Sequence, residues 1–342
     1  MTALSSFYAS QLRQELGLRN RLYARGRPHV ESYGNPTVIV YAPENGRHGN
    51  FFDPAYAAIA RNPDWMRRFD KVHAQAARTL PKAERRWREL DSSMSSDALL
   101  MNVFCTPGVA ESAPVRNALG VEDDAAPVFG WKARVPLVRQ ASSPARLNSG
   151  RFDRTEVDMR FGSLLVEAKL TESDFQTRAA QIVEAYRDFD RVFERDLLPR
   201  VDLPTARPRR ASEFPENLSQ EFESLTGDPD SFSAMDFVVS APGEAGYAGY
   251  QLIRNVLAAY AAECSFCVVH DARRPDLREQ WFQVMAAVKS AELRVRLMVL
   301  TWQELAAILP HELQLFLDLK YGIVTPGRIP SPIGEFEDSD SH

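Results

Sequence analysis

One short stretch of the chain combines two carboxylates and a lysine at the spacing of paired strands. Residues 155–169 predict two strands joined at Gly162-Ser163. Residues two apart on a strand point to the same face, so Glu167 and Lys169 project together, and a hairpin folds Asp158 back towards them. Two carboxylates beside a lysine are what a hydrolase needs to hold a divalent cation and activate a water molecule.

An exposed hairpin that carries ordinary surface charges is the alternative interpretation of these residues. The apolar run Leu164-Leu165-Val166 leads directly into Glu167. A run of this kind favours a core strand that delivers its charges into a cleft.

Composition limits the classes of protein to which the chain can belong. Its 342 residues, 44% hydrophobic and 25% charged, are typical of a soluble globular protein of one or two domains. It has no apolar run of about 18 residues and its first residues lack a signal-peptide pattern, so we expect a cytoplasmic protein without membrane contact. Three cysteines argue against a disulfide framework. With a net charge of −5, nucleic-acid binding would depend on local arginine clusters.

The first hundred residues predict an extension followed by helical sequence. Residues 1–75 form the N-terminal extension, with a helix over 6–25 and a strand over 37–41. A long helical period follows from Pro81 to Phe104, and the serines at 92–96 predict the cap of a fresh helix. Asp97 and Asn102 stand among apolar residues there, so they either face a site or make capping and turn bonds.

Strands and helices alternate through the rest of the chain. A strand is expected over 128–138, then the hairpin, then a helix over 175–193 in which aromatic and aliphatic residues recur at helical spacing. Residues 198–232, rich in Pro, Arg, Ser and Asp, predict an irregular insertion, and the glycines of 241–250 predict a hinge or turn.

The C-terminal third predicts a buried strand between helices. In the helix that starts near 251, Gln251, Arg254 and Asn255 share one polar face. The strand over 264–271 contains a single CxxC, which indicates buried thiols rather than a metal or redox site. A helix over 276–290, a strand over 295–300, a helix capped by Thr301 and a last helix over 311–321 follow, with an acidic tail at 326–342.

This order of elements resembles the PD-(D/E)xK, or restriction-endonuclease-like, nuclease superfamily. Asp158 matches the metal-binding aspartate of that superfamily, Glu167 its second acidic ligand, and Lys169 its lysine. Segments 95–104 and 251–255 are similar to those of a little-characterised bacterial branch, in which Gln often stands where Asp97 is here. The resemblance implies an α/β fold over residues 76–325, with a mixed central sheet flanked by helices in αβββαβ order.

The resemblance also implies a metal site and roles for its neighbours. One or two Mg²⁺ or Mn²⁺ ions would be held by Asp158, Glu167 and the Ala168 carbonyl, with Glu156 as a candidate for a further ligand. Lys169 would orient or deprotonate the attacking water and stabilise the charge that builds on the phosphate. The candidates for an additional upstream acid are Glu89 and Asp97. Gln251 is the candidate for a contact to the attacking water or to a phosphate.

The implied function is metal-dependent hydrolysis of DNA, in defence or repair. Basic and amide side chains would contact the nucleic acid, and the candidates are Arg254, Asn255, Arg207, Arg209 and Arg210. A catalytically inactive nuclease-like fold that serves as a nucleic-acid-binding or assembly module is the alternative, and a hydrolase of small phosphate esters is a third possibility.

Overall fold

A five-stranded mixed sheet forms the centre of the molecule. The computed structural model describes residues 2–32, 36–71, 88–138, 152–203 and 245–333. The strands lie in the order β14-β13-β9-β8-β5. Their bounds are Leu297–Thr301, Ser265–His270, Leu164–Ala168, Glu156–Phe161 and Val128–Lys132, respectively. The predicted α/β class with a mixed sheet is confirmed.

The sheet is antiparallel in one half and parallel in the other. β5, β8 and β9 pair antiparallel in chain order, and Phe161 faces Leu164 across the turn at Gly162-Ser163. β9, β13 and β14 pair parallel. Parallel neighbours need a long crossover, and here helix α10 (Tyr250–Ala261) lies between β9 and β13 in the chain. The hairpin therefore stands where the two halves of the sheet meet.

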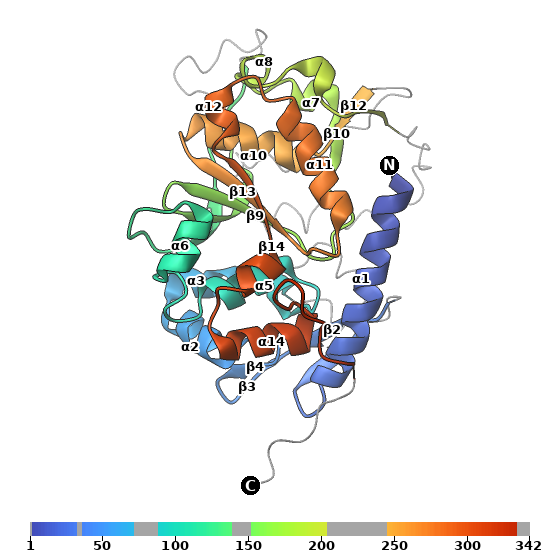
Figure 1. Cartoon of the computed structure of the whole chain (residues 1–342), viewed down its shortest axis with the longest axis vertical. Coiled ribbons are helices and arrows are strands. Elements are labelled where there is room, and N and C mark those ends of the chain that lie inside the picture. The colour runs from blue at the N-terminus through green and yellow to red at the C-terminus, as the bar shows by residue number, and fades with distance from the viewer. Residues whose placement is uncertain (1, 33–35, 72–87, 139–151, 204–244, 334–342) are drawn as a thin grey trace, which may run out of the picture.

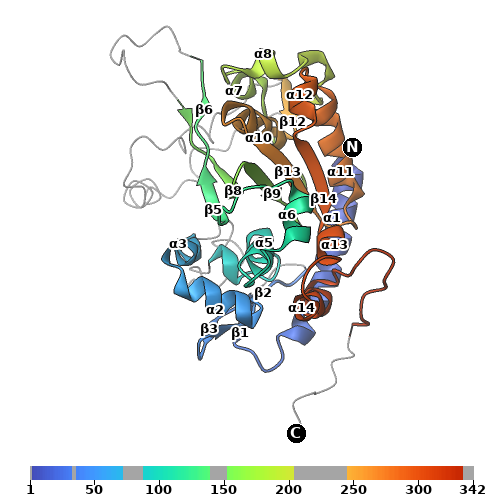
Figure 2. The same ribbon diagram turned by 60° about the vertical axis from the view of Figure 1, so that its left-hand side comes forward.

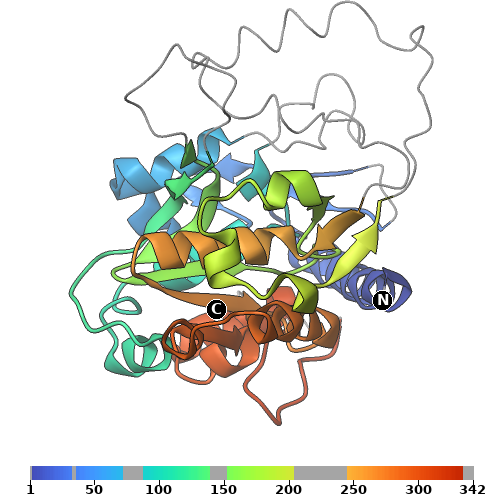
Figure 3. The same ribbon diagram turned by 90° about the horizontal axis from the view of Figure 1, so that it is seen from above.

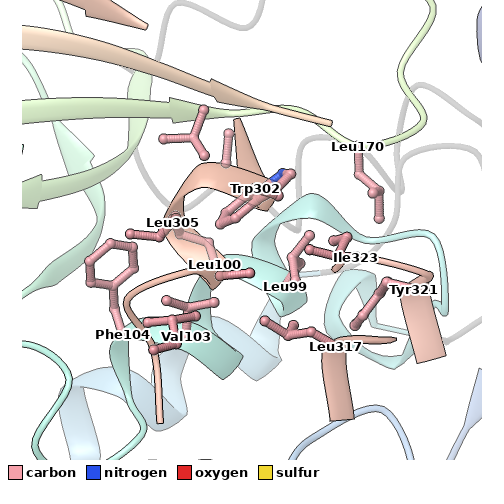
Figure 4. Close-up of a cluster of buried hydrophobic side chains, with 14 of the residues drawn as sticks. Leu99, Leu100, Val103, Phe104, Leu170, Trp302, Leu305, Leu317, Tyr321 and Ile323 are labelled. Atoms are coloured by element: carbon pink, nitrogen blue, oxygen red, sulfur yellow. The ribbon is translucent and has the colours of Figure 1, made fainter. Parts of the chain in front are cut away.

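Helices cover both faces of the sheet (Figure 1). One face packs on α5 (Ser96–Phe104), α13 (Trp302–Ala306) and α14 (His311–Tyr321), whose apolar side chains meet in the cluster of Figure 4. The other face packs on α10 and α11 (Pro275–Ala286), and seen from above α7 (Ala180–Val183) and α8 (Phe189–Val192) lie over α10 (Figure 3). α6 (Ala113–Leu119) and α12 (Ala291–Arg294) complete the helical layers.

The N-terminal residues complete the core. Helix α1 (Thr2–Tyr23) packs on α14 and α11, and its Leu12 and Leu16 belong to the same buried cluster as Val166 of β9. α2 (Asp53–Arg61), α3 (Pro63–Met66) and a 3₁₀ turn, η1 (Arg67–Asp70), lie beside α5 near the β5 edge (Figure 2). Two small antiparallel pairs precede them, β1 (His29–Glu31) with β2 (Ile39–Tyr41) and β3 (Pro43–Glu44) with β4 (Arg47–His48). The division into an extension and a nuclease-like domain stays a prediction.

The prediction of one helix over residues 175–193 is wrong. The segment contains β10 (Thr177–Ala179), α7 and α8. The 3₁₀ turn η4 (Arg195–Leu197) and strand β11 (Arg200–Asp202) follow it in the chain. β10 and β11 both pair with β12 (Ala245–Ala248). The helical spacing of its apolar residues arises because separate short elements all face α10. Residues 245–248, predicted as part of a hinge, are therefore a strand.

The helical period predicted from Pro81 to Phe104 begins later than expected. Residues 72–87 lie outside the described part of the chain. Glu89–Asp91 is a 3₁₀ turn, η3, and α5 begins only at Ser96, where the Ser95 hydroxyl accepts the Ala98 N–H and caps the helix as the serine cluster predicted. A further small pair, β6 (Val135–Pro136) with β7 (Phe152–Asp153), replaces the second half of the strand expected over 128–138. Among the described helices, none has the length and apolarity needed to cross a membrane.

Asn102 joins α5 to the N-terminal residues. The side chain is fully buried, its Oδ1 accepts the Phe52 N–H at 2.7 Å, and its Nδ2 donates to the carbonyl oxygens of Asn50 and Ala98 at 3.1 and 2.8 Å. Of the two interpretations of this polar residue, internal hydrogen bonding is the one that the structure supports.

We expect Asn102→Ala to lower the free energy of unfolding by about 2–4 kcal/mol, because it leaves the partly buried Phe52 N–H and the buried Asn50 carbonyl without partners. Denaturant unfolding followed by circular dichroism measures the change. Asn117→Ala, at an exposed position of α6, is the matched control and should change the value by less than about 0.5 kcal/mol. Equal losses for the two variants would contradict the assignment.

Candidate active site

The hairpin opens at its end, and a carboxylate fills the gap. The last paired residues before the gap are Met159 and Val166, so Asp158 and Glu167 come next and point to the same face. The Ala168 N–H donates to Asp158 Oδ2 at 2.8 Å. Asp158 therefore replaces a strand partner and is held at the point where β8 and β9 part.

Glu167 and Lys169 form a buried ion pair at the end of β9. Glu167 is 1% exposed and Lys169 5%. Lys169 Nζ donates to Glu167 Oε1 at 2.7 Å. Burial disfavours the charge of the lysine, but the carboxylates of Glu167, Glu172 and Asp158 outweigh it and raise the pKa of Lys169. Lys169 is therefore an ammonium at neutral pH.

Helix α10 supports the acidic residues from behind. Asn255 Nδ2 donates to Glu167 Oε2 at 2.7 Å, and the Arg254 guanidinium donates both to Asn255 Oδ1 and to the Glu156 carbonyl at 2.8 Å. Both side chains are buried: Asn255 orients the Glu167 carboxylate, and Arg254 orients Asn255 and holds the backbone of β8. The expected contact of Arg254 and Asn255 with nucleic acid stays a prediction. Gln251, on the same polar face as expected, is half-buried near the start of the helix.

Asp158 lacks a directly paired counter-ion. Within the described ranges, no lysine, arginine or histidine forms an ion pair with it. Burial raises the pKa of Asp158 well above its ordinary value, and the nearby carboxylates of Glu167 and Asp97 raise it further. Two acidic side chains thus converge here without enough positive charge between them.

Two of the other three predicted acids are bound by an arginine from the N-terminal region. Arg68, in η1, donates through Nη1 to Glu156 Oε2 and through Nη2 to Asp97 Oδ2, both at 2.6 Å. Lys71 Nζ lies 3.4 Å from Asp97 Oδ2 and 2.9 Å from Glu89 Oε2. Of the two candidates for the upstream acid, Asp97 lies close enough for its charge to raise the pKa of Asp158. Glu89 is connected to the site through its ion pair with Lys71.

The structure brings most of the predicted residues together and adds others. Asp158, Glu167, Lys169, Glu156 and Asp97 share one region, whereas Arg207, Arg209 and Arg210 lie outside the described residues. Sequence reasoning missed Arg68 and Lys71, because nothing in their spacing connects them to the hairpin. It also missed Glu172, which accepts hydrogen bonds from Ser96 Oγ at 2.5 Å and the Leu170 N–H at 2.7 Å.

The donor set suits a hard divalent cation. In the part of the chain that the structure describes, no group of three His, Cys, Asp or Glu side chains is arranged to hold a metal ion. Mg²⁺, however, is commonly bound by one or two carboxylates and completes its shell with water. Asp158 and Glu167 supply two such groups, and a cation would relieve the mutual repulsion that raises the pKa of Asp158.

Comparison with known proteins gives one match. A family model described as "Restriction Endonuclease associating with ARP" matches residues 20–322 of the 342. Neither a curated protein nor a solved structure matches the chain. The matched range includes the hairpin, α10 and the segment that carries Arg68.

We expect Asp158→Asn to stabilise the metal-free protein at pH 7 by about 0.5–2 kcal/mol, the usual size of a stabilising substitution. Because the pKa of Asp158 is raised in the folded state, its ionisation destabilises the fold as pH increases from acid to neutral. The gain should vanish near pH 3, where the carboxyl is protonated in both states.

Urea unfolding in the presence of a chelator, at both pH values, measures this difference. Asp124→Asn, at a fully exposed carboxylate 3.7 Å from Arg116, is the control and should change the free energy of unfolding at pH 7 by less than about 0.5 kcal/mol. A variant of Asp158 less stable than the parent protein at pH 7 would show that the carboxylate is not under repulsion.

Proposed function

This chain belongs to the family described as Restriction Endonuclease associating with ARP, and we propose that it is a divalent-metal-dependent nuclease that hydrolyses DNA phosphodiester bonds. The observation that carries the proposal is the convergence of Asp158, Glu167 and Lys169 at the end of β9. Action in DNA defence or repair is part of the same proposal.

Asp158 and Glu167 are the proposed ligands of one Mg²⁺ or Mn²⁺ ion, with the Ala168 carbonyl, whereas Glu156, expected from the sequence as a further ligand, is bonded by Arg68. When bound, the ion would supply Lewis-acid stabilisation of the phosphate and lower the pKa of a bound water. The protein's part is to keep the carboxylates in place. The Ala168 N–H orients Asp158, and Asn255 orients Glu167.

Lys169 is the proposed cation that stabilises negative charge on the phosphate. Its pairing with Glu167 keeps it protonated, and a fixed ammonium in a site shielded from water stabilises developing charge strongly. Accepting a proton from the attacking water would require Lys169 to lose its own first, which the same pairing opposes. Gln251 is the proposed contact to the attacking water or to a phosphate oxygen.

We expect Lys169→Met to lower the rate of DNA cleavage by a factor of about 100 or more, as loss of a positioned charge at a reacting phosphate does. Nicking of supercoiled plasmid in Mg²⁺ or Mn²⁺, followed on gels, measures the rate. Lys289→Met is the matched control, because Lys289 is half-exposed and bonds only Asp190 and Glu194 among the described residues.

Cleavage at the parental rate by the Lys169 variant would overturn the assignment of the site. A parent protein that binds Mn²⁺ but cleaves no DNA would instead favour the alternative, an inactive nuclease-like fold that acts as a nucleic-acid-binding or assembly module. Hydrolysis of small phosphate esters without cleavage of DNA would identify a different hydrolase.

A further inference from the structure

An arginine occupies the space between two carboxylates of the candidate site. The Arg68 guanidinium makes 2.6 Å hydrogen bonds to Asp97 on α5 and to Glu156 on β8. Arg68 is 9% exposed and Asp97 5%. The Glu156 side chain is 37% exposed, so the bond to Asp97 is the buried one of the two. Short charge-assisted hydrogen bonds to two different carboxylates are among the stronger interactions of a side chain.

Arg68 is carried by a firmly packed segment. The next residue, Phe69, is buried in a cluster with Phe51, Leu90 and Ala98. On the other side, Trp65 Nε1 donates to the Pro127 carbonyl at 3.1 Å. Contacts on both sides of Arg68 hold its backbone in place, and the bonds to Asp97 and Glu156 orient its guanidinium.

The sheet is shaped to receive this guanidinium. Gly130 of β5 has a φ of +62°, and a Cβ built there would lie 2.1 Å from Arg68 Nη1 and 3.0 Å from Glu156 Oε2. A residue with a side chain would be strained at this φ and would also collide with the guanidinium. The absence of a side chain at Gly130 thus leaves the space that Arg68 fills.

The charges around the site leave room for one divalent ion. Among the described residues, Asp97, Glu156, Asp158, Glu167, Glu89 and Glu172 carry six formal negative charges, and Arg68, Lys71, Lys169 and Arg254 carry four positive ones. The difference of −2 is what one divalent cation neutralises. Two divalent cations would leave an excess of positive charge, because a guanidinium cannot lose its proton in a protein.

We propose that Arg68 permanently fills the cation position between Asp97 and Glu156, so that the site binds one divalent ion, at Asp158 and Glu167, and not two. This inference rests on the nuclease function proposed above and makes Arg68 a positioning residue of that site. Asp97 and Glu156 are then ligands of the guanidinium and not of the metal.

The experiment counts bound Mn²⁺ on the full-length protein by electron paramagnetic resonance and by calorimetry, without DNA. We expect the parent protein to bind one Mn²⁺ and Asp158→Asn to lose it. Arg68→Met should bind two, and adding Asp97→Asn to Arg68→Met should remove the second ion. Arg67→Met is the matched control, because this neighbouring arginine is exposed and, among the described residues, pairs only with the exposed Asp64; it should bind one.

Asp97→Asn alone provides a test that does not depend on the folding of the Arg68 variant. It should still bind one Mn²⁺, and loss of that ion would show that Asp97 is a metal ligand and overturn the inference. Two ions on the parent protein, or a single ion on a folded Arg68→Met, would overturn it as well and leave the proposed function intact. No Mn²⁺ on the parent protein would overturn both.

Discussion

The hydrogen bond from the Ala168 N–H to the Asp158 carboxylate is the interaction on which the candidate site depends. It lies where β8 and β9 separate, and it replaces a strand-to-strand bond with a side-chain acceptor. The separation turns Asp158 and Glu167 to the same face, and the parallel pairing of β9 with β13 puts the end of β9 under α10, which supplies Asn255. A regular hairpin of the same length would leave the carboxylates without this support.

Concentrating so many charges at the end of a sheet is unfavourable unless each is bonded. Moving an ion from water into the protein interior costs several kcal/mol, and an oppositely charged, hydrogen-bonded partner does no more than offset that cost. Glu167 has Lys169 and Asn255, and Asp97 and Glu156 share Arg68, whereas Asp158 has only a backbone N–H among the described residues. The least compensated carboxylate is the one at which a metal ion would gain most. Arg68 also makes the N-terminal region part of the site, in keeping with a family match that starts at residue 20.

The central hairpin could be predicted from sequence because its signals are local. An apolar run ending in Glu167-x-Lys169 and a turn at Gly162-Ser163 together determine strand, register and face. Ser95 and Thr301 were recognised as helix caps for the same reason. The partners of the carboxylates could not be predicted, since Arg68 lies 88 residues from Glu156 in sequence and meets it only through tertiary packing. The prediction of a helix over 175–193 failed because residues from several short elements that are buried against one helix can imitate a helical period. Phe175, Phe189 and Phe193 are examples.

A crystal structure of the protein with bound Mn²⁺ tests the central claim most directly, because the anomalous scattering of manganese locates the ion independently of any assumed ligands. We expect an anomalous peak between the carboxylates of Asp158 and Glu167, with the Lys169 ammonium beside it. A protein whose crystals bind Mn²⁺ only elsewhere, or not at all at concentrations that support catalysis by metal-dependent nucleases, would contradict the assignment of this hairpin as the active site.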